Sequence, residues 1–233
     1  MSTNQQTGRT GRFSNIGGII FDLDGTLADT LLDIAAGVNH ALACEGLATA
    51  DPQQVKAWVG EGYLVLMQRA APAADAEQLQ RLIKTGATYY AAHSLDQTRL
   101  YGGISELLKS LNRVGLPLAV LSNKPNPVTG PIVQALCPEI RFEAVVGYRD
   151  EASKKPNPAL ALEIAGRMAL PAENVLFVGD SATDIATARN AGMPVVAVTW
   201  GFRSREEIAK AGPDAMIDEP QELLALLGVA EGR

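Results

Sequence analysis

The segment GIIFDLDGTLADT, residues 18–30, carries the strongest structural signal in this chain. The short apolar run from residue 16 to residue 22 predicts a buried β-strand. Asp22 and Asp24 stand at positions i and i+2 at its end, so in an extended chain both side chains point the same way. Two carboxylates held this close repel each other unless one is protonated or a cation lies between them. The segment therefore predicts a strand end that carries chemistry.

Two simpler structures explain parts of this segment. Asp24-Gly25 is a common turn dipeptide, but a turn gives no reason for Asp22 on an apolar strand. The spacing from Asp22 to Asp33 is that of a twelve-residue calcium-binding loop. That loop requires glycine at its sixth position, where this chain has Leu27, and a helix before it rather than a strand. Neither alternative accounts for both aspartates.

The rest of the chain divides into a helical part and an alternating part. From about residue 30 to 95 the apolar residues follow helical spacing, and Asp51-Pro52 and Asp75 are typical helix starts. Beyond Gly102-Gly103, helices alternate with strands that we expect at 116–123, 142–147, 174–180, 194–200 and 215–218. Such alternation is typical of a parallel sheet covered by helices on both faces. We predict an α/β fold with a Rossmann-like parallel-sheet core, residues 16–29 and 96–233, and an all-helical domain, residues 30–95, inserted after the first strand.

Composition and charge exclude several classes of protein. The 233 residues are 47% hydrophobic and 20% charged, as in a soluble globular protein, and the net charge of -6 leaves no basic footprint for nucleic acid. No stretch approaches the ~18 apolar residues of a membrane span. The polar residues 1–15, a predicted flexible tail, lack the apolar region of a secretory signal. We therefore predict a cytoplasmic protein that binds neither nucleic acid nor membrane. Cys44 and Cys137 form no Cys-x-x-Cys pair and are expected to be buried, reduced thiols.

Three further polar clusters follow predicted strands or precede helices. They are LSNKP at 121–125, KKPNP at 154–158 and GDSATD at 179–184. Each alone is also an ordinary loop or helix start. In an open α/β sheet, however, ligands bind beyond the carboxyl ends of the strands, so the clusters are expected to meet there.

The order DxDGT, hydroxyl-Asn, Lys-Pro and GDxxxD resembles that of the haloacid dehalogenase superfamily of phosphotransferases, from residue 17 to about 220. The pieces DLDGTLADT, WVGEG, LSNKP, KKPNPAL and FVGDSATDI resemble the phosphoglycolate phosphatase branch in particular. WVGEG, residues 58–62, is the softer match, because a Gly-x-Gly there also fits a turn between helices.

The resemblance implies a Mg²⁺-dependent reaction with a covalent intermediate. Asp22 would be the nucleophile that forms an aspartyl-phosphate, and Asp24 would protonate the leaving alkoxide and later deprotonate water. Asp22, the backbone carbonyl of Asp24 and Asp180 would hold the metal, while Asp184 would orient water or Lys155 beside it.

The remaining roles concern the phosphoryl group and the insertion. Ser122 and the backbone amide of Asn123 would hold phosphoryl oxygens, and Lys155 would offset their charge. Lys155 is preferred over Lys154 because the family lysine directly precedes proline. The insertion would be a cap that closes over the site to exclude water.

The cap carries four further candidates without a motif of their own. Lys56 and Arg69 could grip a substrate carboxylate, but solvated helix charges are the simpler interpretation. Structural roles are expected for His40 and His93.

The leading functional prediction is a phosphatase of small phosphorylated metabolites, with 2-phosphoglycolate as the best single guess. The alternative is a sugar phosphomutase, similar to β-phosphoglucomutase, that uses the same aspartyl-phosphate. A dehalogenase needs no Mg²⁺, and a binding module with a dead site would have lost a carboxylate, whereas this chain keeps all four: Asp22, Asp24, Asp180 and Asp184. The oligomeric state is not readable from the sequence.

Overall fold

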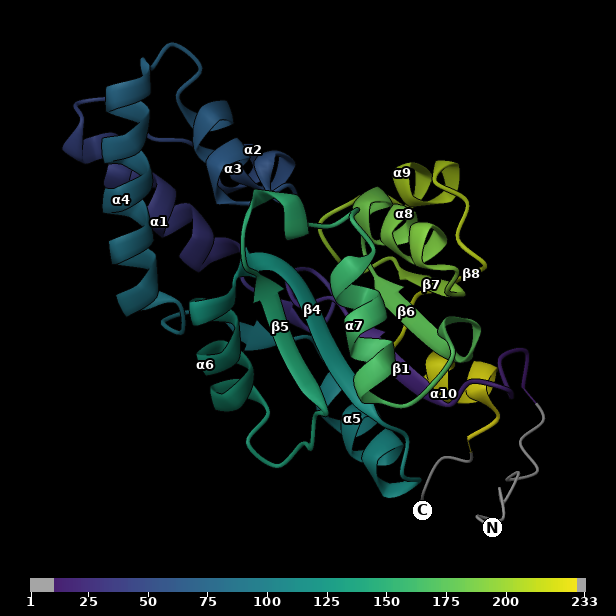
Figure 1. The fold of residues 1–233 in the computed structure, drawn as a ribbon. Helices are drawn as coiled ribbons and strands as arrows, with labels where there is room; N and C mark the ends of the chain where they lie inside the picture. Colours follow the sequence, from purple (N-terminus) through teal and green to yellow (C-terminus); the bar gives the residue numbers. More distant parts are fainter. Residues whose placement is uncertain (1–10, 230–233) are drawn as a thin grey trace.

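The computed structural model describes residues 11–229 and, within them, a parallel sheet of six strands (Figure 1). The strands lie in the order β5-β4-β1-β6-β7-β8, and each neighbouring pair is parallel. Their bounds are β1 Gly18–Phe21, β4 Leu118–Pro125, β5 Ala144–Tyr148, β6 Val175–Gly179, β7 Val195–Val198 and β8 Ala215–Ile217. This confirms the predicted α/β fold.

Strand β1 lies at the point where the order of the sheet reverses. The chain continues from β1 to β4 and β5 on one side, and then returns to β6, β7 and β8 on the other. All four residues of β1 are buried, and its register pairs Phe21 with both Val120 and Val178. In open α/β sheets this reversal leaves a crevice beyond the carboxyl ends of the strands. Asp22 is the first residue beyond β1, so it lies in that crevice.

Helices cover both faces of the sheet (Figure 1). Because successive strand residues point to opposite faces, Ile20 and Phe177 pack in one apolar cluster, while Phe21 and Val178 pack in the other. The first cluster includes α7 (Ala159–Arg167), α8 (Ala182–Ala191) and α9 (Arg205–Lys210). The second includes α5 (Ile104–Arg113), α6 (Asn126–Leu136) and α10 (Glu222–Leu227). Two short 3-10 turns, Glu151–Ser153 and Ala172–Asn174, precede α7 and β6.

The inserted segment folds into four helices, which stand apart from the sheet at the upper left of Figure 1. They are α1 (Leu31–Cys44), α2 (Pro52–Trp58), α3 (Tyr63–Ala70) and α4 (Ala76–His93). Asp51 and Asp75 are the N-caps of α2 and α4, and their side chains accept hydrogen bonds from the Gln53 and Gln78 amides. The two predicted helix starts are therefore confirmed. WVGEG forms the turn between α2 and α3.

The two connections between the insertion and the core lie side by side. Strands β2 (Ala28–Asp29) and β3 (Arg99–Leu100) pair as a short antiparallel ribbon that the sequence did not indicate. Next to it, the buried carboxylate of Asp33 accepts hydrogen bonds from the Gln97 amide and from the Thr98 amide and hydroxyl. The chain therefore enters and leaves the insertion at one fixed place.

The structure also bears on the predictions for the N-terminal tail and for the two cysteines. Most of the expected tail, residues 1–10, lies outside the described residues, but Phe13 within it is buried and its amide donates to the Leu226 carbonyl. Cys137 is buried, whereas Cys44 is exposed near the end of α1, so the prediction of two buried thiols was wrong for Cys44. Cys44 follows the apolar stripe of α1 but points away from it.

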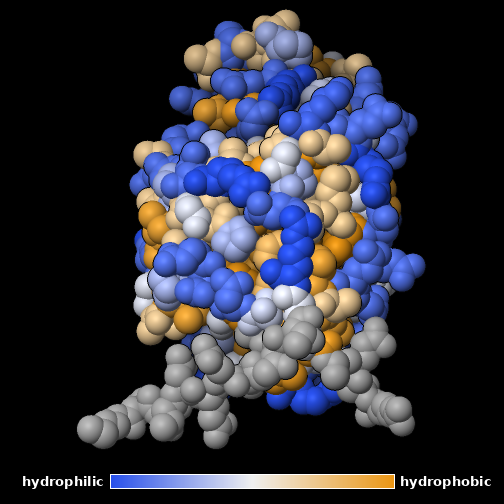
Figure 2. Space-filling view, turned by 90° about the vertical axis from the view of Figure 1, so that its right-hand side faces the viewer, coloured by the Kyte–Doolittle hydropathy of each residue, from blue (hydrophilic) through white to orange (hydrophobic). Residues whose placement is uncertain are grey.

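The described surface gives no sign of a membrane span. None of the described helices has the length and hydropathy to cross a bilayer. Figure 2 shows the side of the molecule that lies on the right in Figure 1, where hydrophilic side chains are interspersed with hydrophobic ones.

Candidate active site

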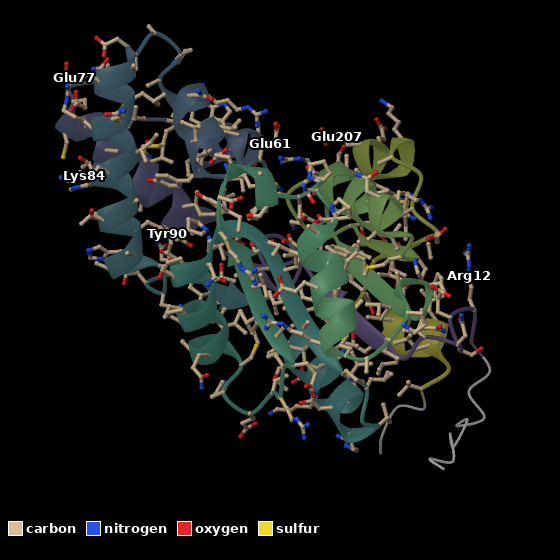
Figure 3. The ribbon with its side chains drawn as sticks, in the orientation of Figure 1. Arg12, Glu61, Glu77, Lys84, Tyr90 and Glu207 are labelled. Carbon is tan, nitrogen blue, oxygen red and sulfur yellow. The ribbon has the colours of Figure 1, made fainter. Side chains whose placement is uncertain are left out.

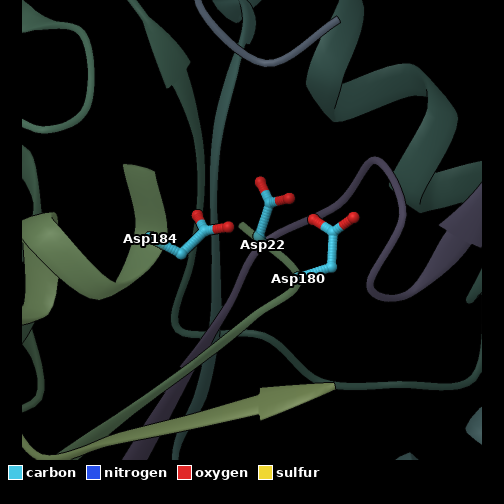
Figure 4. Close-up of side chains that lie close together, drawn as sticks. All are labelled: Asp22, Asp180 and Asp184. Atoms are coloured by element: carbon cyan, nitrogen blue, oxygen red, sulfur yellow. The ribbon is translucent and has the colours of Figure 1, made fainter. Parts of the chain in front are cut away.

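Three carboxylates meet at the carboxyl end of the sheet (Figure 4). Asp22 follows β1, Asp180 follows β6, and Asp184 lies in the first turn of α8. Each offers a carboxylate oxygen, and these oxygens all lie within 4.8 Å of one another. All three residues are buried. Asp22 and Asp184 are 162 positions apart in the sequence, and the fold brings their carboxylates together.

Lys155 is the cation of this cluster. Its Nζ lies 2.6 Å from Asp22 Oδ1 and 2.6 Å from Asp184 Oδ1, and only 4% of its side chain is exposed. Burial alone would lower the pKa of Lys155, but Asp184 and Asp22 raise it above its ordinary value. Lys154 instead pairs with Glu151, outside the cluster. Of the two lysines weighed from the sequence, Lys155 is thus the one that contacts the carboxylates.

One lysine does not balance three buried acids. Burial, and then the nearby Asp184, raise the pKa of Asp180 to about 7, although the Phe202 amide donates to its Oδ2 at 2.6 Å. Burial also raises the pKa of Asp22 well above its usual range, against the opposing effect of Lys155. Without a further cation, Asp22 and Asp180 therefore resist ionisation more than an ordinary aspartate does.

The donor set fits a small divalent cation. Mg²⁺ prefers oxygen ligands and is bound through one or two carboxylates together with waters and phosphate oxygens. The backbone around Asp180 is shaped for close approach: a Cβ on Gly25, which has a φ of +86°, would lie 2.3 Å from Asp180 Oδ2. The structure thus supplies oxygen ligands, excess negative charge and glycine where a side chain would intrude.

Asp24 lies in a second group, next to the first. Its Oδ1 accepts a hydrogen bond from the Thr30 hydroxyl at 2.6 Å and lies 3.1 Å from Lys124 Nζ. Lys124 Nζ also donates to the hydroxyl of Tyr90 at 2.8 Å. Although burial alone lowers the pKa of Lys124, the Asp24 carboxylate raises it above its ordinary value. The predicted acid–base residue therefore has its own buried lysine.

Ser122 and Asn123, in the second half of β4, line the same cavity. The Ser122 hydroxyl accepts from the Lys124 amide at 3.2 Å. Asn123 Nδ2 donates to the carbonyls of Lys155 and Gly60, both at 3.0 Å, and its Oδ1 accepts from the Lys155 amide. The sequence suggested a role only for the backbone amide of Asn123, whereas its side chain ties together β4, the segment of Lys155 and the insertion.

The cavity lies between the sheet and the insertion. It has a volume of about 90 Å³, and its lining includes the turn between α2 and α3 and the helices α3 and α4. Arg203, from the loop after β7, donates to the carbonyls of Lys56, at 2.9 Å, and Val59. Arg203 and Asn123 therefore hold the insertion against the core.

The other cap candidates lie away from this cavity. Neither Lys56 nor Arg69 is part of its lining, and the Arg69 guanidinium bonds to Glu61 and the Trp58 carbonyl. His40 and His93 stack on opposite sides of the Tyr89 ring. None of the four therefore lines the cavity, and Arg69 is bonded within the insertion rather than solvated as the simpler interpretation had it.

All seven predicted site residues line or adjoin the cavity between the sheet and the insertion. Several other residues that line it were not predicted. Asp22, Asp24, Ser122, Asn123, Lys155 and Asp180 line the cavity, and Asp184 contacts Lys155 at its edge. The residues missed are Lys124, Tyr63, Tyr90, Phe202 and Arg203. Lys124 had a signal, because it stands at i+2 from Ser122 and so shares its side of β4. The others come from distant elements and carry no local motif.

Comparisons with known proteins show which family the chain is similar to. The sequence model of the family described as haloacid dehalogenase-like hydrolase matches residues 19–198. A phosphoglycolate phosphatase of Escherichia coli (strain K12) is 36% identical over an alignment that covers 94% of this chain and 95% of that protein. The same figures hold for a phosphoglycolate phosphatase of Salmonella choleraesuis. A crystal structure described as a predicted phosphoglycolate phosphatase from Haemophilus somnus superposes with a TM-score of 0.85 at 33% identity, over 90% of this chain and 97% of that one.

Proposed function

Because the chain belongs to the haloacid dehalogenase-like hydrolase family and is a phosphoric monoester hydrolase, we propose that it hydrolyses 2-phosphoglycolate to glycolate and phosphate through an aspartyl-phosphate on Asp22. The observation that carries this proposal is the buried group of Asp22, Lys155 and Asp184, set beside a second carboxylate, Asp24, with a lysine of its own. In this proposal Asp22 attacks phosphorus, and Asp24 gives a proton to the leaving oxygen.

The residues divide the reaction into two displacements. A carboxylate oxygen of Asp22 attacks phosphorus, and the bond to the ester oxygen breaks as Asp24 gives that oxygen its proton. Asp24, now ionised, then takes a proton from water, whose oxygen attacks the same phosphorus and releases Asp22. Ser122 and the Asn123 amide hold the phosphoryl oxygens, and Lys155 offsets their charge. The second step returns both carboxyl groups to their starting states.

A Mg²⁺ ion is the proposed cofactor. Asp22, Asp180 and the backbone carbonyl of Asp24 would hold it, with Asp184 orienting Lys155 or water beside them. When bound, it supplies positive charge that neutralises the phosphate and favours the ionised form of the carboxylates. This matches the raised pKa values of Asp22 and Asp180 in the protein alone.

The choice of 2-phosphoglycolate over a hexose phosphate rests mainly on the relatives of this chain. A phosphomutase must also keep its sugar phosphate in the closed site while it turns, whereas here Arg203 and Asn123 hold the insertion against the core. The matching phosphoglycolate phosphatases favour the same substrate.

The experiment is a panel of phosphomonoesters assayed for released phosphate with Mg²⁺. We expect a higher kcat/KM for 2-phosphoglycolate than for hexose phosphates, and no conversion of hexose 1-phosphate to 6-phosphate. Rapid isomerisation with little phosphate release would replace hydrolysis with transfer. Efficient hydrolysis of a different ester would overturn the substrate and leave the two-step mechanism standing.

A further inference from the structure

We propose that Lys124 and the hydroxyl of Tyr63 form a receptor for the carboxylate of the leaving group, and so select phosphate esters of 2-hydroxy acids over esters of neutral alcohols. This inference rests on the proposed function and adds to it the residues that read the substrate. Lys124 lies on β4 of the core, and Tyr63 begins α3 of the insertion. Both line the cavity.

The position of Lys124 follows from that of Asp24. The ester oxygen must approach Asp24 to receive its proton, and Lys124 Nζ lies 3.1 Å from Asp24 Oδ1. In 2-phosphoglycolate a single carbon separates the ester oxygen from the carboxylate carbon. A substrate placed for proton transfer from Asp24 therefore brings its carboxylate to the part of the cavity that holds Lys124.

Lys124 is also a lining cation whose charge is only partly neutralised. An ammonium group has three N–H donors, and those of Lys124 serve Asp24 and Tyr90. Lys155 is shared between two carboxylates, and Arg203 donates to two carbonyls of the insertion. Lys124, with one carboxylate and one neutral hydroxyl as partners, is therefore neutralised less than Lys155, and it contacts Asp24, where the leaving group must lie.

Tyr63 provides an independent observation. Its hydroxyl is buried and has no hydrogen-bond partner among the described residues, which is costly for a polar group in an apolar place. Burial raises the pKa of Tyr63 while the nearby Lys124 lowers it, so the hydroxyl stays protonated and lies in the field of that lysine. A carboxylate bound to Lys124 would give this hydroxyl the acceptor that it lacks.

The backbone of α4 makes room for this arrangement. A Cβ on Gly86 would lie 2.2 Å from the Tyr63 hydroxyl, so glycine there lets the hydroxyl approach. Tyr90, four residues further along α4, faces the core in Figure 3, while Glu77 and Lys84 point away from it. The apolar side chains of Ile34, Leu66 and Val128 complete this part of the cavity. In such surroundings an ion pair is stronger than in water.

The test compares two esters of equal length, 2-phosphoglycolate and 2-hydroxyethyl phosphate, in four variants. Lys124→Met should lower the ratio of their kcat/KM values roughly 100-fold, the effect of removing one partner of a buried charge pair. Tyr63→Phe should lower it roughly 10-fold, through loss of one hydrogen bond to a charged group. Lys109→Met, on an exposed lysine, and Tyr89→Phe, on the outer side of α4, should keep the wild-type ratio.

The outcomes separate this inference from the proposed function. If the wild-type enzyme prefers the neutral ester, the proposed substrate is wrong. If it prefers 2-phosphoglycolate and both site variants lose activity on the two esters equally, Lys124 and Tyr63 only position Asp24, and the receptor is overturned. Tyr63→Phe removes a hydroxyl without a partner among the described residues and should fold like the wild type. Its ratio of kcat/KM values therefore tests the receptor even if Lys124→Met is unstable.

Discussion

Two buried lysine–aspartate groups lie in the same cavity and are built from different parts of the chain. Lys155 joins Asp22 and Asp184, and all three come from the core. Lys124 joins Asp24 to Tyr90, which belongs to helix α4 of the insertion. The exposed fractions of the two lysine side chains are nearly equal, at 4% and 5%. Burial therefore does not distinguish the groups, but the origin of their members does.

We infer from this difference that the group of Lys155 acts on the phosphoryl group, whereas the group of Lys124 selects the substrate. The group of Lys155 can form wherever the sheet forms, and it serves the phosphoryl group that every substrate shares. The group of Lys124 is complete only when the insertion rests on the core, and it adjoins the part of the substrate that varies. We therefore expect changes in the first group to affect all esters alike, and changes in the second to affect esters according to their leaving group.

The largest expected effect is that of Asp22→Asn. The amide is nearly the same shape but a poor nucleophile, so turnover should fall at least about a thousandfold for every ester. Phosphate release under saturating substrate measures the loss, and circular dichroism checks that the fold is kept. Asp29→Asn, on the exposed residue of the β2–β3 ribbon, is the matched control. Retention of even a tenth of wild-type turnover would contradict the covalent role.

Removal of divalent metal should also abolish turnover in every ester, and its effect on stability should depend on pH. The pKa of Asp180 is about 7 in the folded protein, above its ordinary value. Between pH ~4 and ~7 the unfolded chain releases this proton first, so without metal the folded state should lose stability as the pH rises. Mg²⁺ should restore stability above this range, because it favours the ionised carboxylate.

Thermal unfolding with and without Mg²⁺, at pH 5.5 and pH 8, measures this linkage. The increase in Tm on addition of Mg²⁺ should be larger at pH 8. Asp180→Asn should flatten the pH dependence, because it removes the titrating group. An equal increase in Tm at both pH values would show that these acids do not bind the ion.

Asp24→Asn tests the second group. General acid catalysis contributes roughly 10²–10⁴-fold, so hydrolysis of 2-phosphoglycolate should slow by that order. An aryl ester such as 4-nitrophenyl phosphate has a leaving group that needs no proton, and its first step should slow far less. Burst kinetics separate the formation of the intermediate from its hydrolysis. Equal losses in the first step of both esters would remove Asp24 from the role of acid.

The sequence predicted the core group better than the group shared with the insertion. Asp22 and Asp180 directly follow strands and Lys155 lies shortly before α7, so the alternation that could be read directly brings them to the same edge of the parallel sheet. Lys124 could also have been predicted from the sequence, since the i, i+2 spacing that pairs Asp22 with Asp24 also pairs Ser122 with Lys124. It was missed because β4 was expected to end at Asn123 and ends at Pro125 instead.

The residues that the insertion supplies could not be found in this way. Tyr90 stands in α4 at i+8 from Leu82, as an ordinary buried position of a helix would, and nothing local shows that it reaches a lysine of the core. The ribbon of β2 and β3 fixes the approach, but each strand has two residues, too few for any alternation. Packing between distant elements determines these contacts, and a periodic pattern does not encode it.

The smallest expected effect is that of Arg203→Lys, and it tests whether holding the insertion differs from reading the substrate. Lysine keeps the charge, but it lacks the planar fork with which Arg203 donates to the Lys56 and Val59 carbonyls. Loss of about one hydrogen bond is equivalent to a change of roughly two- to twelvefold, and it should raise KM for 2-phosphoglycolate and for 2-hydroxyethyl phosphate equally. Arg205→Lys, two positions on and paired with Asp218 on the surface, is the control. A change in the ratio of the two esters would mean that Arg203, rather than Lys124, recognises the carboxylate.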